Sequence, residues 1–153
     1  MRQKKILFVC LGNICRSPMA EFVFRDLAEK RGVGVKYEVV SAATSAEEIG
    51  NTVHYGTRDK LREHGISTAG KRAVRLERGD YEKYDLLVGM EARNLADMRR
   101  ITGGDPEGKI HRLLDFSPRP RDIADPWYTG NFDLTYDDVL EGCEALLEKL
   151  EQK

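Results

Sequence analysis

The chain has 153 residues, of which 41% are hydrophobic, and its formal net charge is −1. This length predicts a single domain, 1–153, with a sizeable core, and argues against several domains. A nearly neutral chain gives no electrostatic reason to expect a nucleic acid or a membrane surface as a partner.

The N-terminal segment and the cysteines indicate the compartment. The apolar run that follows Lys5 is too short for a signal-peptide core or a membrane span. Three cysteines without a Cys-x-x-Cys pair form neither a disulfide framework nor a zinc site. We therefore expect a cytoplasmic protein that uses its cysteines for thiol chemistry and needs no metal.

The first third of the chain predicts a strand, a helix and a second strand. A continuous apolar run over 4–10 is typical of a strand buried on both faces of a parallel sheet. Apolar residues at helical spacing follow, with Ser17 as the expected N-cap and Pro18 at the first helical position. The segment 35–42 predicts the second strand. The loop after the first strand then lies at the carboxyl edge of the sheet.

The rest of the chain continues this alternation. In chain order, the pattern predicts a loop over 44–51, a largely exposed helix over 52–64, a strand over 84–90, a helix around 95–101, a short strand over 110–116, the longest loop over 117–131 and a final helix with an apolar face over 139–150. Cys143 falls on that apolar face and is expected in the core. We predict an α/β fold of three layers, with a small four-stranded parallel sheet and helices on both faces.

The connection between the first strand and the first helix is Cys10-Leu11-Gly12-Asn13-Ile14-Cys15-Arg16-Ser17. A loop that turns from a buried strand into a helix points its backbone N–H groups inward, and the helix dipole adds positive charge. Gly12 and Asn13 both tolerate the positive φ that a sharp reversal needs. Arg16 adds a planar fork of donors for two phosphate oxygens. The sequence therefore predicts a phosphate-binding loop.

Cys10 lies at the mouth of this loop, where positive charge favours a thiolate. A thiolate under a phosphate-sized nest is a nucleophile aimed at phosphorus. Alternatively, Cys10 is a small hydrophobe that ends a core strand, and Arg16 and Ser17 are ordinary first-turn residues. We prefer the catalytic interpretation because the loop residues fall at the spacings that one mechanism requires.

The string Cys-Leu-Gly-Asn-Ile-Cys-Arg-Ser-Pro resembles the low-molecular-weight protein tyrosine phosphatases. The resemblance also covers Ser41–Thr44, Ile49–Asn51, His64–Ile66 and Asp125–Tyr128. It implies hydrolysis of phosphotyrosine and other aryl phosphates through a cysteinyl-phosphate intermediate, with release of inorganic phosphate and no cofactor. Cys10 is then the nucleophile and Arg16 the phosphate clamp. Asn13 and Ser17 would support the thiolate and the loop through hydrogen bonds.

The reaction also needs a proton donor for the leaving oxygen and a base for the attacking water, and one carboxyl group can do both. The residues alone leave Asp115, Asp122 and Asp125 open, because Asp-Pro is an ordinary turn signal. The resemblance assigns the role to Asp125. Trp127 and Tyr128 follow on the same loop, and we interpret them as walls of a slot for a phenyl ring rather than as core aromatics.

Two positions depart from the pattern of this family. Glu47 stands where many members have an aromatic residue, so we expect the second slot wall to be missing or acidic. Gly70 and Lys71 stand where many members have a His that supports the loop, and we expect this support to be rebuilt around Ser41 or to be weaker. The predicted substrate-binding residues are Leu11, Gly12, Asn13, Ile14, Cys15, Ser17, Glu47, Trp127 and Tyr128.

Three other functions use a similar loop. Protein-arginine phosphatases have Thr at the position of Ile14, and the apolar Ile side chain cannot hydrogen-bond a guanidinium. Arsenate reductases, which are oxidoreductases, relay oxidation through two mid-chain cysteines, and this chain has none between Cys15 and Cys143. A module that only binds phosphate would need no nucleophile. A phosphotyrosine phosphatase is therefore the preferred function.

Cys15 lies on the same loop as Cys10, so their Cα atoms are expected within the roughly 4.4 to 6.8 Å of a disulfide. A thiolate in a nest is readily oxidised, and a nearby thiol can intercept the sulfenic acid. The sequence leaves open whether Cys15 has this redox role or only packs beneath the loop.

Overall fold

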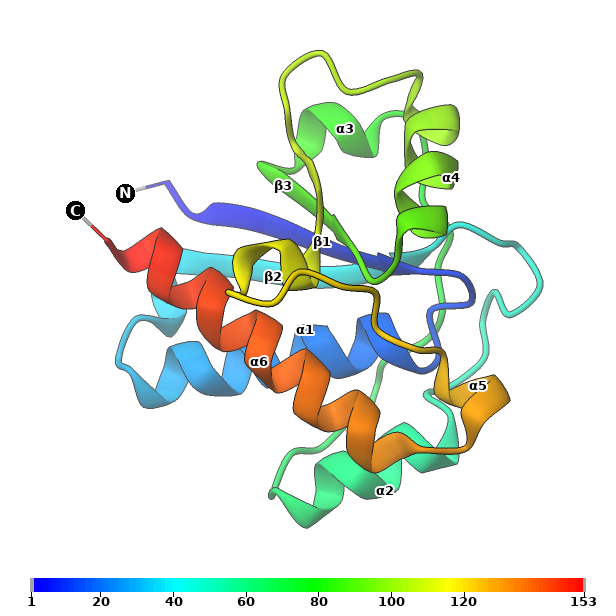
Figure 1. Ribbon diagram of the computed structural model, residues 1–153, viewed down its shortest axis with the longest axis vertical. Coiled ribbons are helices and arrows are strands. Elements are labelled where there is room, and N and C mark those ends of the chain that lie inside the picture. The colour runs from blue at the N-terminus through cyan, green and yellow to red at the C-terminus, as the bar shows by residue number, and fades with distance from the viewer. Residues whose placement is uncertain (1, 153) are drawn as a thin grey trace.

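Four parallel strands form the central sheet of the computed structural model, which describes residues 2–152 (Figure 1). The first and last residues of the expected domain, 1–153, lie outside the described residues. The strand order is β2-β1-β3-β4. The strands are β1 (Lys4–Cys10), β2 (Tyr37–Ala43), β3 (Leu86–Gly89) and β4 (Ile110–Arg112). The predicted α/β fold with a four-stranded parallel sheet is confirmed.

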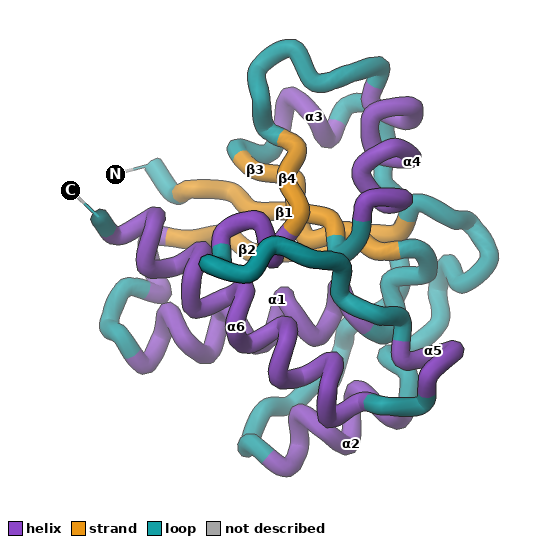
Figure 2. The backbone as a smooth tube through the Cα atoms, viewed as in Figure 1, coloured by secondary structure: helices purple, strands orange, loops and turns teal. Residues whose placement is uncertain are grey.

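Helices cover both faces of this sheet (Figure 2). Ile6 and Phe8 of β1 pack into the core that α1 (Arg16–Lys30) and α6 (Phe132–Glu151) close. Leu7 and Val9 point to the opposite face and share a core with Tyr81 of α3 (Asp80–Lys83) and Met98 of α4 (Ala92–Thr102). Because side chains alternate along a strand, the apolar run of β1 supplies both cores. The other two helices are α2 (Tyr55–Glu63) and α5 (Pro126–Thr129).

The first helix begins earlier than the sequence predicted. Cys15 occupies the N-cap position without a side-chain cap, and Ser17 lies inside the helix, so the predicted capping role of Ser17 is wrong. The hydroxyl of Ser17 instead lies 3.1 Å from Sγ of Cys10. Serine is typical of helix caps, but the Ser17 hydroxyl contacts the sulfur of Cys10 instead of the end of the helix.

Several predicted elements are shorter in the structure. The second strand starts at Tyr37, because Val35 lies in a 3-10 turn and is 84% exposed. The helix predicted over 52–64 is α2, and His54 caps it: its Nδ1 accepts the N–H of Gly56 at 3.0 Å. The strand predicted over 84–90 is reduced to β3, and the prediction of strand over 113–116 is wrong. A 3-10 turn there buries Leu113 and Leu114, which an apolar run alone does not distinguish from strand.

The last helices follow the prediction more closely. Gly103, with φ of 89°, ends α4. Cys143 is fully buried in α6, as predicted. The long loop over 117–131 contains the single turn α5, and α3 has no counterpart among the predicted elements. No helix within residues 2–152 is long and apolar enough to cross a membrane.

Candidate active site

The phosphate loop, residues 11–15, leaves the carboxyl end of β1 and runs into α1. Its reversal is made at Asn13, whose φ is 58°, and not at Gly12, which lies outside the positive-φ region. The Asn13 amide holds this conformation by donating to Oγ of Ser17 at 2.8 Å and Oγ of Ser41 at 2.9 Å. Its Oδ1 accepts the N–H of Val74 at 3.1 Å. These buried hydrogen bonds offset the cost of a left-handed residue.

The same hydrogen bonds direct donors toward the sulfur of Cys10. Ser41 donates to Oε1 of Glu21 at 2.6 Å, so its oxygen is free to accept from Asn13. Ser17 also accepts from Asn13, and its hydroxyl lies 3.1 Å from Sγ of Cys10 and 3.5 Å from the carbonyl of Ala42. The backbone N–H of Asn13 donates to Sγ at 3.3 Å. The side chain of Ser17 and the backbone of Asn13 thus both contact the Cys10 sulfur.

Lys71 contacts Ser41 and Glu21, the two residues that lie behind Asn13 in this network. Its Nζ donates to the carbonyl of Ser41 at 2.9 Å and lies 3.8 Å from Oε1 of Glu21. Burial lowers the pKa of the Lys71 ammonium, against the opposing effect of the Glu21 carboxylate. The sequence left open whether the support at this position is rebuilt around Ser41 or weaker, and the structure has it rebuilt there.

Arg16 opens α1 at the edge of the phosphate loop and is only 1% exposed. Its NH1 donates to Oε2 of Glu91 and to the carbonyl of Ile123, each at 2.9 Å, and its NH2 donates to Oδ2 of Asp125 at 3.3 Å. Burial lowers the pKa of the guanidinium, but the negative charges around it outweigh burial and raise that pKa. The buried Nε–H has no partner among residues 2–152. Arg16 is thus held in a fixed plane with a donor left for a ligand.

The backbone of the phosphate loop leaves further donors. Within the described part of the chain, the N–H groups of Leu11, Gly12, Ile14 and Cys15 donate to no protein acceptor. Successive N–H groups without protein partners, at the start of a helix, form an anion nest. The loop and the Nε–H of Arg16 together suit a tetrahedral oxyanion above Cys10.

A pocket opens above the loop, lined by Cys10, Leu11, Gly12, Ile14, Cys15, Arg16, Ser45, Glu47, Glu48, Asp125, Trp127 and Tyr128. Trp127 and Tyr128 are 56% and 77% exposed, so they are walls and not core residues. Glu47 lies across the pocket rim and is exposed. The predicted substrate-binding residues Asn13 and Ser17 do not line the pocket, because their side chains lie buried beneath the loop.

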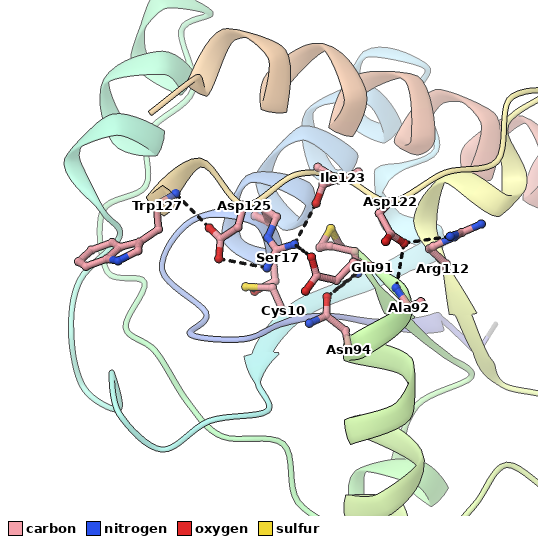
Figure 3. A network of polar contacts seen from close by, with 12 residues as sticks. Cys10, Ser17, Glu91, Ala92, Asn94, Arg112, Asp122, Ile123, Asp125 and Trp127 are labelled. Atoms are coloured by element: carbon pink, nitrogen blue, oxygen red, sulfur yellow. Dashed lines mark hydrogen bonds and ion pairs between the residues drawn. The ribbon is translucent and has the colours of Figure 1, made fainter. Parts of the chain in front are cut away.

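Of the three candidate acids, Asp125 is the one that the structure brings to the pocket (Figure 3). It caps α5, with Oδ1 accepting the N–H of Trp127 at 3.0 Å, while Oδ2 faces Arg16. The two alternatives lie away from the pocket: Asp115 and Asp122 form ion pairs with Arg112 at 2.7 Å and 2.9 Å. We therefore call residues 117–131 the acid loop.

Cys15 lines the pocket but is 4% exposed and packs in a small apolar cluster with Ile14 and Ala73. Burial, followed by the negative charge of Cys10, raises the pKa of the Cys15 thiol to about 12. The thiols of Cys10 and Cys15 are both free. In residues 2–152 no group of three or more His, Cys, Asp and Glu side chains is placed to hold a metal ion.

Four site residues escaped the sequence analysis. Ser45 and Glu48 line the pocket, Glu91 holds Arg16, and Glu21 holds Ser41. Glu91 carried one usable signal: it lies two residues after β3, the strand next to β1, and the carboxyl ends of neighbouring parallel strands meet at one edge of the sheet. Glu21 carried none, because it falls in a helix where a charged residue ordinarily faces solvent.

Comparisons with known proteins agree with this geometry. Residues 5–153 match the model of a family described as low molecular weight phosphotyrosine protein phosphatase. The low molecular weight protein-tyrosine-phosphatase YfkJ of Bacillus subtilis is 42% identical over 150 residues, which cover 97% of this chain and 96% of the relative. The low molecular weight phosphotyrosine protein phosphatase of Gallus gallus is 39% identical over 95% of each chain. The crystal structure of YfkJ has a TM-score of 0.94 at 41% identity and covers 99% of both chains.

Proposed function

The chain belongs to the low molecular weight phosphotyrosine protein phosphatase family, and from this membership we propose the roles of its residues. It is a protein-tyrosine phosphatase, a hydrolase that acts on phosphoproteins. We propose that Cys10 is the nucleophile, Arg16 the phosphate clamp and Asp125 the general acid and base. The main support is that donors without a protein partner, the loop N–H groups and Nε of Arg16, belong to residues that line one pocket with Cys10.

The first step transfers the phosphoryl group to the enzyme. A lone pair of the Cys10 thiolate forms the S–P bond while the bond from phosphorus to the aryl oxygen breaks. Asp125 donates a proton to the departing oxygen, which leaves as a phenol. The loop N–H groups and Arg16 stabilise the charge that spreads over the three remaining phosphoryl oxygens.

The second step releases phosphate. The Asp125 carboxylate takes a proton from a water molecule, and the water oxygen attacks phosphorus. The S–P bond breaks, and its electron pair returns to Cys10 as a thiolate, which Ser17 and the N–H of Asn13 are placed to receive. The products are inorganic phosphate and the starting enzyme, with Asp125 protonated for the next cycle.

The substrate is a phosphotyrosine within a protein. The aromatic walls Trp127 and Tyr128 are suited to a phenyl ring, and the buried, apolar Ile14 offers no hydrogen bond to a guanidinium. These features favour phosphotyrosine over phosphoarginine. We also propose that 1–153 acts as one phosphatase domain, without nucleic acid or membrane partners, in the cytoplasm, where unpaired cysteines are the rule.

Steady-state assays on phosphotyrosine, phosphoarginine and arsenate, side by side, test this function. We expect turnover of phosphotyrosine without added metal, and none of the other two at comparable rates. Cys10→Ser is expected to lose turnover and keep its affinity for inorganic phosphate. Turnover by Cys10→Ser, or loss of wild-type activity on chelation, would overturn the mechanism.

A further inference from the structure

His54 has no part in the proposed mechanism, yet it connects the two halves of the site. Its backbone N–H donates to the carbonyl of Ile14 in the phosphate loop at 2.9 Å. Its ring packs edge-on against Trp127, with centroids 5.5 Å apart at an interplanar angle of 75°. The same ring stacks on Phe132 at 5.3 Å and 11°. One residue therefore contacts the phosphate loop, a pocket wall and the start of α6.

Besides its chain neighbour Tyr55, on which it stacks at 4.4 Å, His54 has two aromatic partners, and these lie on either side of the turn that follows Asp125. Trp127 belongs to α5, and Phe132 begins α6 directly after the acid loop. Figure 1 shows α5 beside the N-terminal ends of α2 and α6. The close packing of Phe132 also explains Gly56, where a Cβ would lie 2.3 Å from Cζ of that ring. The ring of His54 is thus fixed against both ends of this turn.

Trp127 and Arg16 together hold the proposed acid, each bonded to one oxygen of Asp125. The backbone N–H of Trp127 donates to Oδ1 of Asp125 at 3.0 Å, so a shift of α5 moves the carboxyl group away from the pocket. This helix is a single turn and cannot hold itself in place. Pro126 is buried, but Trp127 is more than half exposed, and its ring packs edge-on against the ring of His54.

We propose that His54 is a positioning residue, whose ring anchors Trp127 and thereby keeps Asp125 in place for proton transfer. This inference rests on the proposed function, because it requires Asp125 to be the acid. The competing account is that His54 matters only as the cap of α2, through its bond with Gly56. The proposal requires the aromatic ring of His54, whereas the competing account requires only a hydrogen-bond acceptor for the N–H of Gly56.

Two substitutions separate the ring from the cap. His54→Phe keeps an aromatic ring and loses the acceptor at Nδ1. His54→Asn keeps a capping acceptor and loses the ring. For both variants we would measure kcat/KM across aryl phosphates of increasing leaving-group pKa, together with iodide quenching of Trp127, the only tryptophan of the chain.

The proposal predicts opposite results for the two variants. His54→Asn should lose roughly ten- to a hundredfold in kcat/KM for poor leaving groups, the usual cost of a misplaced catalytic group. The loss should shrink for good leaving groups, affinity for inorganic phosphate should be unchanged, and Trp127 should be quenched more easily. His54→Phe should stay close to the wild type in every measurement. If His54→Phe instead loses kcat/KM for poor leaving groups while His54→Asn behaves like the wild type, the proposal is overturned and His54 matters only as the cap of α2.

Asp125→Asn, assayed in parallel, separates failure of this proposal from failure of the proposed function. If Asp125→Asn lowers kcat/KM by the same factor for all leaving groups, the acid assignment fails, and the His54 inference fails with it. If Asp125→Asn shows the leaving-group dependence and His54→Asn does not, only the His54 inference fails. Should His54→Asn not fold, Phe132→Leu removes the second ring contact and leaves the cap of α2 intact. It should show the same leaving-group dependence, and a uniform effect would contradict the proposal.

Discussion

The phosphate loop and the acid loop are directed at the same phosphate but are held by different means. Beneath the phosphate loop, the side chains of Asn13, Ser17 and Ser41 are buried and hydrogen-bonded to one another. The acid loop is held at one end by Arg16, which donates to the carbonyl of Ile123 and to Asp125. Elsewhere it is tied to α6 by ion pairs of the partly exposed Arg121. Buried polar networks are costly to disturb, whereas exposed ion pairs contribute little. The nucleophile is therefore surrounded by buried hydrogen bonds, whereas the acid loop depends in part on weaker, partly exposed ion pairs.

Asp125→Asn removes the proton donor and leaves the phosphate loop intact. We expect the rate for poor leaving groups to fall by roughly two to four orders of magnitude, the usual contribution of a positioned acid. The loss should shrink as the leaving phenol becomes more acidic. A series of substituted phenyl phosphates measures this, and an equal loss across the series would remove Asp125 from the acid role.

Asn13→Ala breaks the network under the phosphate loop. It leaves Ser17, Ser41 and the N–H of Val74 short of partners, so we expect a loss of roughly 1–3 kcal/mol in the free energy of unfolding. Asn13→Gly is the matched control, because it tolerates the φ of 58° and also lacks the amide. Denaturant unfolding compares them. If Asn13→Gly is as stable as the wild type, the hydrogen bonds contribute nothing and the contrast between the loops fails.

The sequence was most informative where the chemistry is contiguous. From Cys10 to Ser17, each residue type has a role that follows from its neighbours on the same loop. The acid could not be chosen this way, because Asp115, Asp122 and Asp125 all lie near turns, and only the resemblance separated them. The ion pair from Arg16 to Glu91 joins positions far apart in the chain, and no local pattern encodes it.

Local sequence patterns also gave wrong predictions where the same residue type is compatible with two structural roles. Ser17 has the chemistry of a helix cap, but its hydroxyl contacts the Cys10 sulfur instead. The apolar run 110–116 changes from strand to 3-10 turn after Arg112, and burial is similar in both conformations. His54 was predicted inside a helix that in fact starts after it. In each case a tertiary contact determines the role or conformation of the residue, and the local sequence does not reveal that contact.

Oxidation tests whether Cys15 adds a covalent link to the phosphate loop. Peroxide should convert Cys10 to a sulfenic acid, which condenses with the Cys15 thiol to give a disulfide and water. A dithiol should then restore activity, while Cys15→Ser, treated alike, should recover much less. Because burial raises the pKa of the Cys15 thiol to about 12, more of it is thiolate at higher pH, and the recovery of activity after peroxide should improve as pH rises. Equal recovery of both proteins, or no loss of two hydrogens by mass, would leave Cys15 as packing.

Glu141→Gln tests how weakly the acid loop is tied to α6. Hydrogen bonds from Arg121 and Ser117 lower the pKa of Glu141 to about 2. The folded pKa lies below the unfolded value, so this stabilisation is complete above about pH 5 and is lost as pH falls toward 2. After solvent screening we expect about 1 kcal/mol or less. Urea unfolding at a series of pH values measures it, and a constant difference between variant and wild type down to pH 2 would contradict this account.

Glu47→Gln should have the smallest effect. The exposed Glu47 carboxylate at the pocket rim should repel acidic residues that flank a phosphotyrosine, by about 1 kcal/mol or less. At low ionic strength, the activity of the variant on acidic peptides should therefore rise relative to its activity on basic peptides. This difference from the wild type should disappear in high salt. An unchanged ranking of the peptides at low salt would dismiss this role.

Trapping the intermediate tests the central claim most directly, that the phosphate loop presents Cys10 to phosphorus. Asp125→Asn, mixed with an aryl phosphate that has a good leaving group and quenched in acid, should accumulate a phosphorylated enzyme, since the base for its hydrolysis is missing. Peptide mass spectrometry should place the phosphoryl group on Cys10, and Cys10→Ser in the same background should carry none. A phosphoryl group on another residue, or turnover without any phosphoenzyme in the burst, would contradict the account.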